Sequence, residues 1–166
     1  MAKITYTTKI DNQTSTLPAV NKVAAADLTQ NVWTDLTNDK AGSNTNVIYK
    51  PSYITGDLWD SASNSLKFSE IGVGKVLIIR NDFDITAGAS NTRLDARLYF
   101  PDTGKTVEFM HDNIASNNEL VRYSRTTQIF IQSSELTSGC KIQVKVDKSG
   151  CTATVENFLI TVLSHF

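Results

Sequence analysis

Alternation of apolar and polar residues with a period of two is the feature of this sequence that most constrains its fold. Residues 92–100 carry apolar side chains at every second position and charged side chains between them. The apolar positions are Leu94, Ala96, Leu98 and Phe100, and the charged ones are Arg93, Asp95 and Arg97. Residues 141–147 repeat the pattern with Ile142, Val144 and Val146. This period is typical of a half-buried antiparallel strand, because successive side chains of a strand point to opposite faces.

Turn-forming residues separate alternating segments along most of the chain. We expect strands over residues 32–37, 47–55, 66–69, 76–86, 92–100, 105–110, 120–132, 140–147 and 152–163. Helical periodicity is nearly absent, and only residues 24–29 and 115–121 are expected to form a helical turn or two. Short strands without βαβ alternation predict an all-β fold, an antiparallel jelly-roll sandwich of about eight to ten strands. An immunoglobulin-like sandwich is the alternative, which the missing Cys…Trp…Cys spacing disfavours.

Length and charge set the broad class of the protein. With 166 residues the chain is long enough for one domain with its own core. A formal net charge of −1 provides no field that would attract nucleic acid or an anionic membrane. No segment has the length of apolar sequence that a membrane span needs, and the N-terminus lacks the apolar region of a secretory signal. We therefore expect a chain that folds in a cytoplasm and binds neither nucleic acid nor membrane.

The first 30 residues differ in composition from the rest of the chain. They are polar, rich in Thr and Asn, and without strong periodicity. Such a segment cannot order itself, but it can order across another protein through main-chain hydrogen bonds and a few anchoring side chains. We therefore predict an extended N-terminal arm over residues 1–30 and a jelly-roll domain over residues 31–166; a free tail is the other interpretation. The expected anchors of the arm are Ile4, Tyr6, Ile10, Leu17, Pro18, Val20 and Val23.

The last predicted strand, residues 152–163, breaks the alternation because both of its faces are apolar. A strand that is apolar on both faces is covered on both faces. In one interpretation a loop or the N-terminal arm covers the second face; in the other, which we favour, a subunit interface does. The interface residues would be Val155, Phe158, Leu159, Ile160 and Leu163. Because homo-oligomers are closed and symmetric, we expect a closed homo-oligomer built around this strand.

Residues suited to catalysis or metal binding are few. The chain has two histidines and two cysteines, and none of them has the spacing of a zinc site. Asp82 and Asp84 share one face of a predicted strand and are expected to be solvated carboxylates. Cys140 and Cys151 are expected to be buried and reduced; a hairpin turn at residues 147–150 would hold them too far apart for a disulfide. We predict no catalytic residue, no metal ligand and no cofactor.

Two groups of side chains suggest surfaces rather than reactive centres. Tyr49, Tyr53 and Trp59 form an aromatic cluster at roughly alternating spacing. Such a cluster is either a wall of the sandwich or a platform on which a sugar stacks, and packing is the commoner use of aromatic strand residues. The arginines at positions 93, 97, 122 and 125 are interspersed with acidic residues, which predicts solvated faces of mixed charge.

The sequence KITYTTKID, followed by LPAVNKVAAADL, resembles an N-terminal segment that recurs in bacteriophage virion proteins, ahead of fibre, baseplate or receptor-binding modules. The matching residues are Lys3–Thr7, Pro18, Val20–Val23 and Ala25–Asp27, with departures at Val20 and Ala24. The helix that usually follows is absent, because residues 28–31 lead directly into a predicted strand; this disfavours a coiled-coil stalk. The strand pattern of the remaining chain is similar to that of the trimeric jelly-roll heads of phage head fibres, capsid decoration proteins and tail-fibre tips.

Together the two resemblances imply a non-enzymatic structural protein of the virion. We expect a homotrimeric head fibre or decoration protein on the capsid surface, assembled in the host cytoplasm. Its N-terminal arm would bind the phage major capsid protein or another virion protein. The alternative is a tail-fibre or receptor-binding module that recognises a host surface glycan or protein. A jelly-roll enzyme is a third alternative, which the missing cluster of carboxylates or histidines disfavours.

Overall fold

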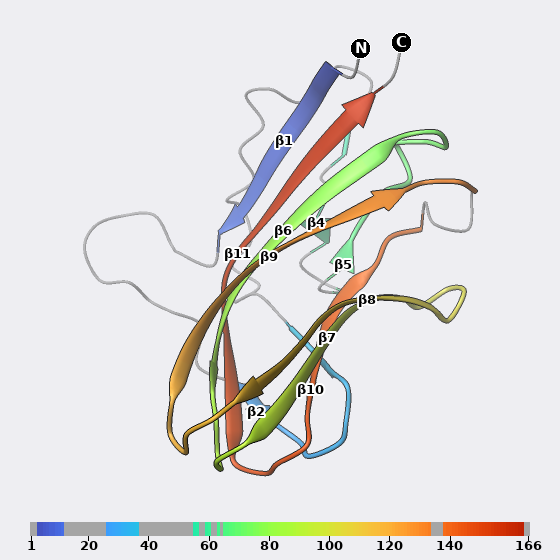
Figure 1. The fold of residues 1–166 in the computed structure, drawn as a ribbon. Helices are drawn as coiled ribbons and strands as arrows, with labels where there is room; N and C mark the ends of the chain where they lie inside the picture. The colour runs from blue at the N-terminus through green and yellow to red at the C-terminus, as the bar shows by residue number, and fades with distance from the viewer. Residues whose placement is uncertain are drawn as a thin grey trace.

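The computed structural model describes residues 3–11, 26–36, 55–56, 59–60, 63, 65–133 and 138–164, of which residues 3–11, 26, 59 and 155–164 are described by their backbone. Eleven strands make up its regular structure (Figure 1). They are β1 (Lys3–Asp11), β2 (Ala26–Leu28), β3 (Thr34–Asp35), β4 (Trp59–Asp60), β5 (Ser65–Leu66), β6 (Val76–Thr86), β7 (Thr92–Phe100), β8 (Lys105–Ile114), β9 (Leu120–Phe130), β10 (Lys141–Val146) and β11 (Cys151–Ser164). Nothing helical in the described part of the chain could serve as a membrane span.

The strands form two main antiparallel sheets. The first has the order β1-β11-β6-β9, with β2 also paired to β11, and the second has the order β3-β10-β7-β8. A small third sheet consists of β4 and β5. The chain crosses from one main sheet to the other between β2 and β3, between β6 and β7, between β8 and β9, between β9 and β10, and between β10 and β11. This arrangement is an antiparallel jelly roll, which confirms the predicted fold class.

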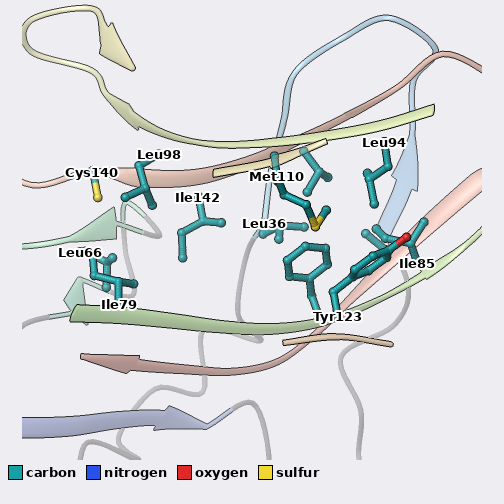
Figure 2. Packing of buried hydrophobic residues seen from close by; sticks show 14 of the residues in the cluster. Leu36, Leu66, Ile79, Ile85, Leu94, Leu98, Met110, Tyr123, Cys140 and Ile142 are labelled. Atoms are coloured by element: carbon teal, nitrogen blue, oxygen red, sulfur yellow. The ribbon is translucent and has the colours of Figure 1, made fainter. Parts of the chain in front are cut away.

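The core lies between the two main sheets and follows from the alternation in the sequence. In β7 and β10 the inward residues Leu94, Ala96, Leu98, Val144 and Val146 are fully buried. Leu77, Ile79, Phe83 and Ile85 of β6 face them, also fully buried. Figure 2 shows Leu98 and Ile142 on one layer directed toward Ile79 on the other. Each large side chain buried in this way contributes about 1.5–3 kcal/mol relative to an exposed one.

The turn between β10 and β11 differs from its prediction. Residues 147–150 do not form a hairpin: β10 pairs with β3 and β7, while β11 pairs with β1, β2 and β6. Both edges of β10 are already paired, so the chain continues into the opposite sheet. Cys140 and Cys151 are nevertheless free and buried, as expected. Gly88 lies against the backbone of Ser149 and Gly150 so closely that a Cβ at this position would clash with it.

The two helical turns predicted from the sequence are wrong. Residues 26–28 form strand β2, and residues 115–119 form an irregular connection between β8 and β9. In the first case the open edge of β11 offers a partner for the main chain, and pairing with it overrides the weak helical preference of Ala24 to Thr29.

Candidate functional site

The N-terminal segment and the last strand, predicted as separate sites, lie side by side in the structure. Strand β1 pairs antiparallel with residues 157–164 of β11 (Figure 1). Three expected anchors are opposite β11 residues: Ile4 pairs with Leu163, Tyr6 with Val162 and Ile10 with Phe158. The other expected anchors, Leu17, Pro18, Val20 and Val23, lie outside the described residues.

Strand β2 continues along the same edge of β11. Ala26 pairs with Ala153, and Leu28 pairs with Cys151. Strands β1 and β2 therefore run in the same direction along one edge, and residues 12–25 connect them. Leu28 is 5% exposed and belongs to the hydrophobic core, so the N-terminal segment contributes to the sheet and to the packing of the sandwich. That residues 31–166 fold without it stays a prediction.

The register of β11 places the predicted interface residues on two different faces of the first sheet. Leu159 and Leu163 pair with Arg80 and Val76 of β6, which lie on the outward face. Val155, Phe158 and Ile160 instead pair with Phe83, Asn81 and Ile79, whose side chains are fully buried on the inward face. Since directly paired residues share a face of an antiparallel sheet, only the positions of Leu159 and Leu163 lie on the outward face. Their use in a subunit interface stays a prediction.

The outer face of the second sheet holds a network of polar side chains centred on Asp95 of β7. The side chain of Asp95 is only 6% exposed. Its Oδ1 lies 2.7 Å from His111 Nδ1 and 3.1 Å from Arg93 Nε, and its Oδ2 lies 3.1 Å from Lys145 Nζ. Burial by itself raises the pKa of Asp95, but the hydrogen bonds from His111, Lys145 and Arg93 outweigh it and hold the pKa below its ordinary value. Asp95 is therefore an ionised carboxylate with three donors.

A second chain of contacts on this face is centred on Arg97. Its Nε donates to Gln143 Oε1 at 2.8 Å, and its guanidinium carbon lies 4.0 Å from the ring centroid of Trp33. The Tyr99 ring centroid is 5.3 Å away. Gln143 Nε2 in turn donates to Asp35 Oδ1 at 2.7 Å. We name Trp33, Arg97, Tyr99 and Gln143 the arginine–tryptophan site.

Sequence reasoning anticipated the charges on this face but not the arginine–tryptophan site. The signal was present: Arg97 and Tyr99 are outward positions of β7, and Gln143 is an outward position of β10. The pairing of Gln143 with Arg97 depends on which strands are neighbours, which alternation does not reveal. The predicted aromatic cluster is not placed, because Tyr49 and Tyr53 lie outside the described residues and only the backbone of Trp59 is described.

Carboxylates of the first sheet are engaged with arginines. The prediction of two solvated carboxylates is wrong for Asp84, which is 2% exposed and receives Arg122 Nε at 2.9 Å and Nη2 at 3.1 Å. Asp82 accepts from Arg80 Nε at 2.9 Å. Over the residues whose side chains are described, no three His, Cys, Asp or Glu side chains are grouped so that they could hold a metal ion.

Comparison with known proteins yields structural likenesses only. No family model and no curated protein matches the sequence. The vertex protein P5 of PRD1 is 15% identical, with 99% of each chain covered and a TM-score of 0.48. The xylan-binding domain CBM22-1 of Paenibacillus barcinonensis Xyn10C is 14% identical, with 99% of this chain and 97% of that one covered and a TM-score of 0.44.

Two further solved structures show the range of these likenesses. Eiger TNF from S. frugiperda is 6% identical, with coverages of 99% and 94% and a TM-score of 0.46. A structure of the infectious bursal disease virus Gx strain is 17% identical, with a TM-score of 0.37; this chain spans 24% of that one, and 56% of this chain is covered. All of these TM-scores are below 0.5 and all identities below 25%, so the likenesses carry no conclusion about function.

Proposed function

We propose that this chain is a non-enzymatic structural protein of a bacteriophage virion, a homotrimeric head fibre or decoration protein held on the capsid by its N-terminal segment. The observation that carries the proposal is the position of β1. The segment that resembles virion proteins in sequence forms an edge strand, and among the described strands β1 pairs with β11 alone. We expect the sandwich of the other strands to fold without β1, which would leave β1 available for attachment.

Main-chain pairing supplies the chemistry of attachment. The bonds that hold β1 on β11 are those by which an extended segment adds to the sheet edge of another protein. Ordering a free segment costs about 1–2 kcal/mol per residue, so the recipient must offer a long edge or several anchoring pockets. Three arms on one trimer add avidity, because each bound arm raises the effective concentration of the next. The recipient is the major capsid protein or another virion protein.

Removing residues 2–25 tests the attachment while keeping β2 and the core residue Leu28. The truncated chain should unfold cooperatively and keep its oligomeric state, yet fail to bind virions that lack this protein. The matched control is the full-length chain with Asp102→Asn, a change in an exposed turn. Particle binding is measured by co-sedimentation and folding by circular dichroism. Equal binding by the truncated and full-length chains would show that the N-terminal segment is not the anchor.

The oligomer is tested at the two outward positions of β11. Leu159→Asp and Leu163→Asp should convert the trimer into a folded monomer, because both positions pair with outward-facing residues of β6. Phe158→Asp, at a position that pairs with buried Asn81, should instead abolish folding. Light scattering at micromolar concentration separates the outcomes, and a monomeric unmodified protein would contradict the trimer.

A receptor-binding module of the tail fibre is the second candidate. The observation that favours it is the half-buried pair of aromatic side chains, Trp33 and Tyr99, beside Arg97 on the outer face of the second sheet. A host surface glycan is the partner that this face would suit. Imaging of virions with a label on the C-terminus would distinguish a position on the capsid from one at the tail.

A further inference from the structure

We propose that the arginine–tryptophan site binds the carboxylate of an acidic sugar, with Arg97 as the anion-binding group and the rings of Trp33 and Tyr99 as the surface against which the sugar packs. The site lies on the second sheet and shares no residue with the N-terminal segment. A failure of sugar binding and a failure of particle attachment are therefore separate results.

The first step of the argument is that Arg97 is held in place before any ligand arrives. Its Nε donates to Gln143 Oε1 at 2.8 Å, and Gln143 Nε2 donates to Asp35 Oδ1 at 2.7 Å. Gln143 is 7% exposed, and only one orientation of its amide can accept from Arg97 while donating to a carboxylate. Asp35 is itself fixed by Lys141 Nζ, 2.6 Å from its Oδ2. Lys141 thus orients Asp35, Asp35 orients Gln143, and Gln143 orients Arg97.

Contact with two aromatic rings also restricts the guanidinium of Arg97. The guanidinium carbon of Arg97 lies 4.0 Å from the ring centroid of Trp33 and 5.3 Å from that of Tyr99. Arginine loses much of its side-chain freedom in such a geometry, and here that loss occurs on folding. A ligand that binds a pre-organised group avoids the corresponding cost and gains affinity.

The terminal nitrogens of Arg97 are the open part of this arrangement. Neither Nη atom has a hydrogen-bond or ion-pair partner among the residues whose side chains are described. Glu108 is opposite Arg97 in the strand register, but its Oε2 contacts His111 Nε2 at 3.2 Å. Asp95 of the same face has three donors of its own, and Asp35 is bound by Gln143 and Lys141. The two Nη groups form a fork that matches the two oxygens of a carboxylate.

The surroundings of the fork favour a sugar acid over other anions. Trp33 and Tyr99 are both half-buried, so part of each ring remains open to a sugar. Arg97 and Lys145 lie over the Trp33 ring, 4.0 Å and 4.6 Å from its centroid, so a pyranose can contact the ring of Tyr99 and the periphery of Trp33. Phosphate-rich polymers are a poorer match, because nucleic acid binding relies on many cations and this chain has a net charge of −1.

Nuclear magnetic resonance of the full chain tests the proposal directly. Trp59→Phe leaves Trp33 as the only tryptophan, since the chain has two, so one indole N–H signal reports on the site. Glucuronate and N-acetylneuraminate should shift this signal in a saturable manner. Methyl glucoside, a neutral sugar, should leave it unchanged at the same concentration. Binding of the acidic sugars should weaken as salt is added, because an ion pair is screened.

Arg97→Lys is the decisive variant because it keeps the charge and removes the fork. We expect an affinity for glucuronate about tenfold lower, since lysine binds a carboxylate as a point charge. Arg80→Lys on the first sheet is the matched control and should bind as the unmodified chain does. Gln143→Leu should also weaken binding, because it releases Nε of Arg97, and dispersion of the amide spectrum shows whether this variant remains folded.

Three results would overturn the proposal. One is the absence of any saturable shift of the Trp33 signal with either acidic sugar. Another is an unchanged affinity in Arg97→Lys. The third is an equal shift produced by sodium acetate at the same concentration and ionic strength, because the sugar ring would then contribute nothing to binding.

Discussion

Asp95 and Asn81 occupy central strands of the two sheets, and both side chains are shielded from water, yet their surroundings are opposite. Asp95, on the outer face of the second sheet, is 6% exposed and is contacted by three donors. Asn81, on the inner face of the first sheet, is fully buried, and neither its Oδ1 nor its Nδ2 has a hydrogen-bond partner among the described residues. A buried polar group contributes to stability only when it is paired, so the same degree of burial has opposite consequences in the two sheets.

Thr127 extends the unpaired region of the first sheet. Its Oγ1 is also buried, without a partner in the described part of the molecule, and Thr127 pairs with Ile79 on β6, two residues from Asn81. The two side chains are therefore diagonal neighbours on the inward face. Asn81 and Thr127 could therefore be replaced by apolar side chains of similar shape without loss of a hydrogen bond within the described part of the molecule. Replacing Asp95 would remove the acceptor of three donors.

The largest effect is expected from Asp95→Ala. Removing the carboxylate leaves His111, Arg93 and Lys145 without their shared acceptor, and it should lower the free energy of unfolding by about 2–3 kcal/mol at pH 7. Urea unfolding followed by circular dichroism measures the change. Asp82→Ala is the control, because Asp82 accepts from Arg80, whose side chain is 50% exposed, and such a pair is worth about 1 kcal/mol or less. Equal losses in the two variants would contradict the special role of Asp95.

Acid should remove the same contribution without a mutation. The pKa of Asp95 is lowered in the folded state, so the folded protein favours the ionised carboxylate. The resulting stability is fully present above the unfolded-state pKa of about 3.9 and is lost as the pH falls through the lower folded-state pKa. The difference in unfolding free energy between the unmodified chain and Asp95→Ala should therefore shrink below about pH 4. A difference that stays constant down to pH 2 would show that the charge of Asp95 is not involved.

A smaller change of opposite sign is expected at Asn81. Asn81→Leu removes an unpaired buried amide at nearly constant volume and should raise the free energy of unfolding by about 1 kcal/mol. Thr127→Val, which replaces one buried hydroxyl by a methyl group, should raise it by roughly half as much. The same urea titrations report both values. Lower stability in both variants would indicate that an ordered water satisfies the two side chains in solution.

The smallest effect concerns Cys140, whose thiol is fully buried. Burial is the only cause of the shift in its pKa. Burial raises the pKa of the Cys140 thiol above its ordinary value, so the thiol is protonated at neutral pH. In the native protein Cys140 should resist iodoacetamide at pH 8 and become labelled only in urea, which mass spectrometry of the peptide shows. Rapid labelling of the native protein would mean that this end of the sandwich opens readily.

The strands that were predicted most accurately are two long ones flanked by clear turn residues. Residues 76–86 and 92–100 are strands β6 and β7 with the predicted bounds. Strand β1 was predicted only as an extended arm, because the polar composition of the first 30 residues outweighed the short alternation of Ile4, Tyr6 and Ile10 with polar residues. It becomes an edge strand because β11 has a free edge at that point, and a neighbour of this kind is a property of the assembled sheet.

The arginine–tryptophan site illustrates the same limit for function. The charges of β7 were visible in the sequence, but Gln143 is 46 positions from Arg97, and Trp33 belongs to a segment before β3. No local pattern links three such segments. Their meeting follows from the order β3-β10-β7 in the second sheet.

In β7 and β10 the amino-acid sequence alone determined which apolar side chains face the core, because a period of two assigns every residue to one of two faces. It also determined the all-β class, since turn residues interrupt the alternation every few positions. Only the tertiary structure decided which strands are neighbours. The turn at residues 147–150 shows why: its residues allow the chain to reverse direction, but they do not say whether it returns along the same sheet or crosses to the other. That choice depends on which strand edges are unpaired. Both edges of β10 are paired, with β3 and β7, so β11 cannot pair with β10 and joins the opposite sheet.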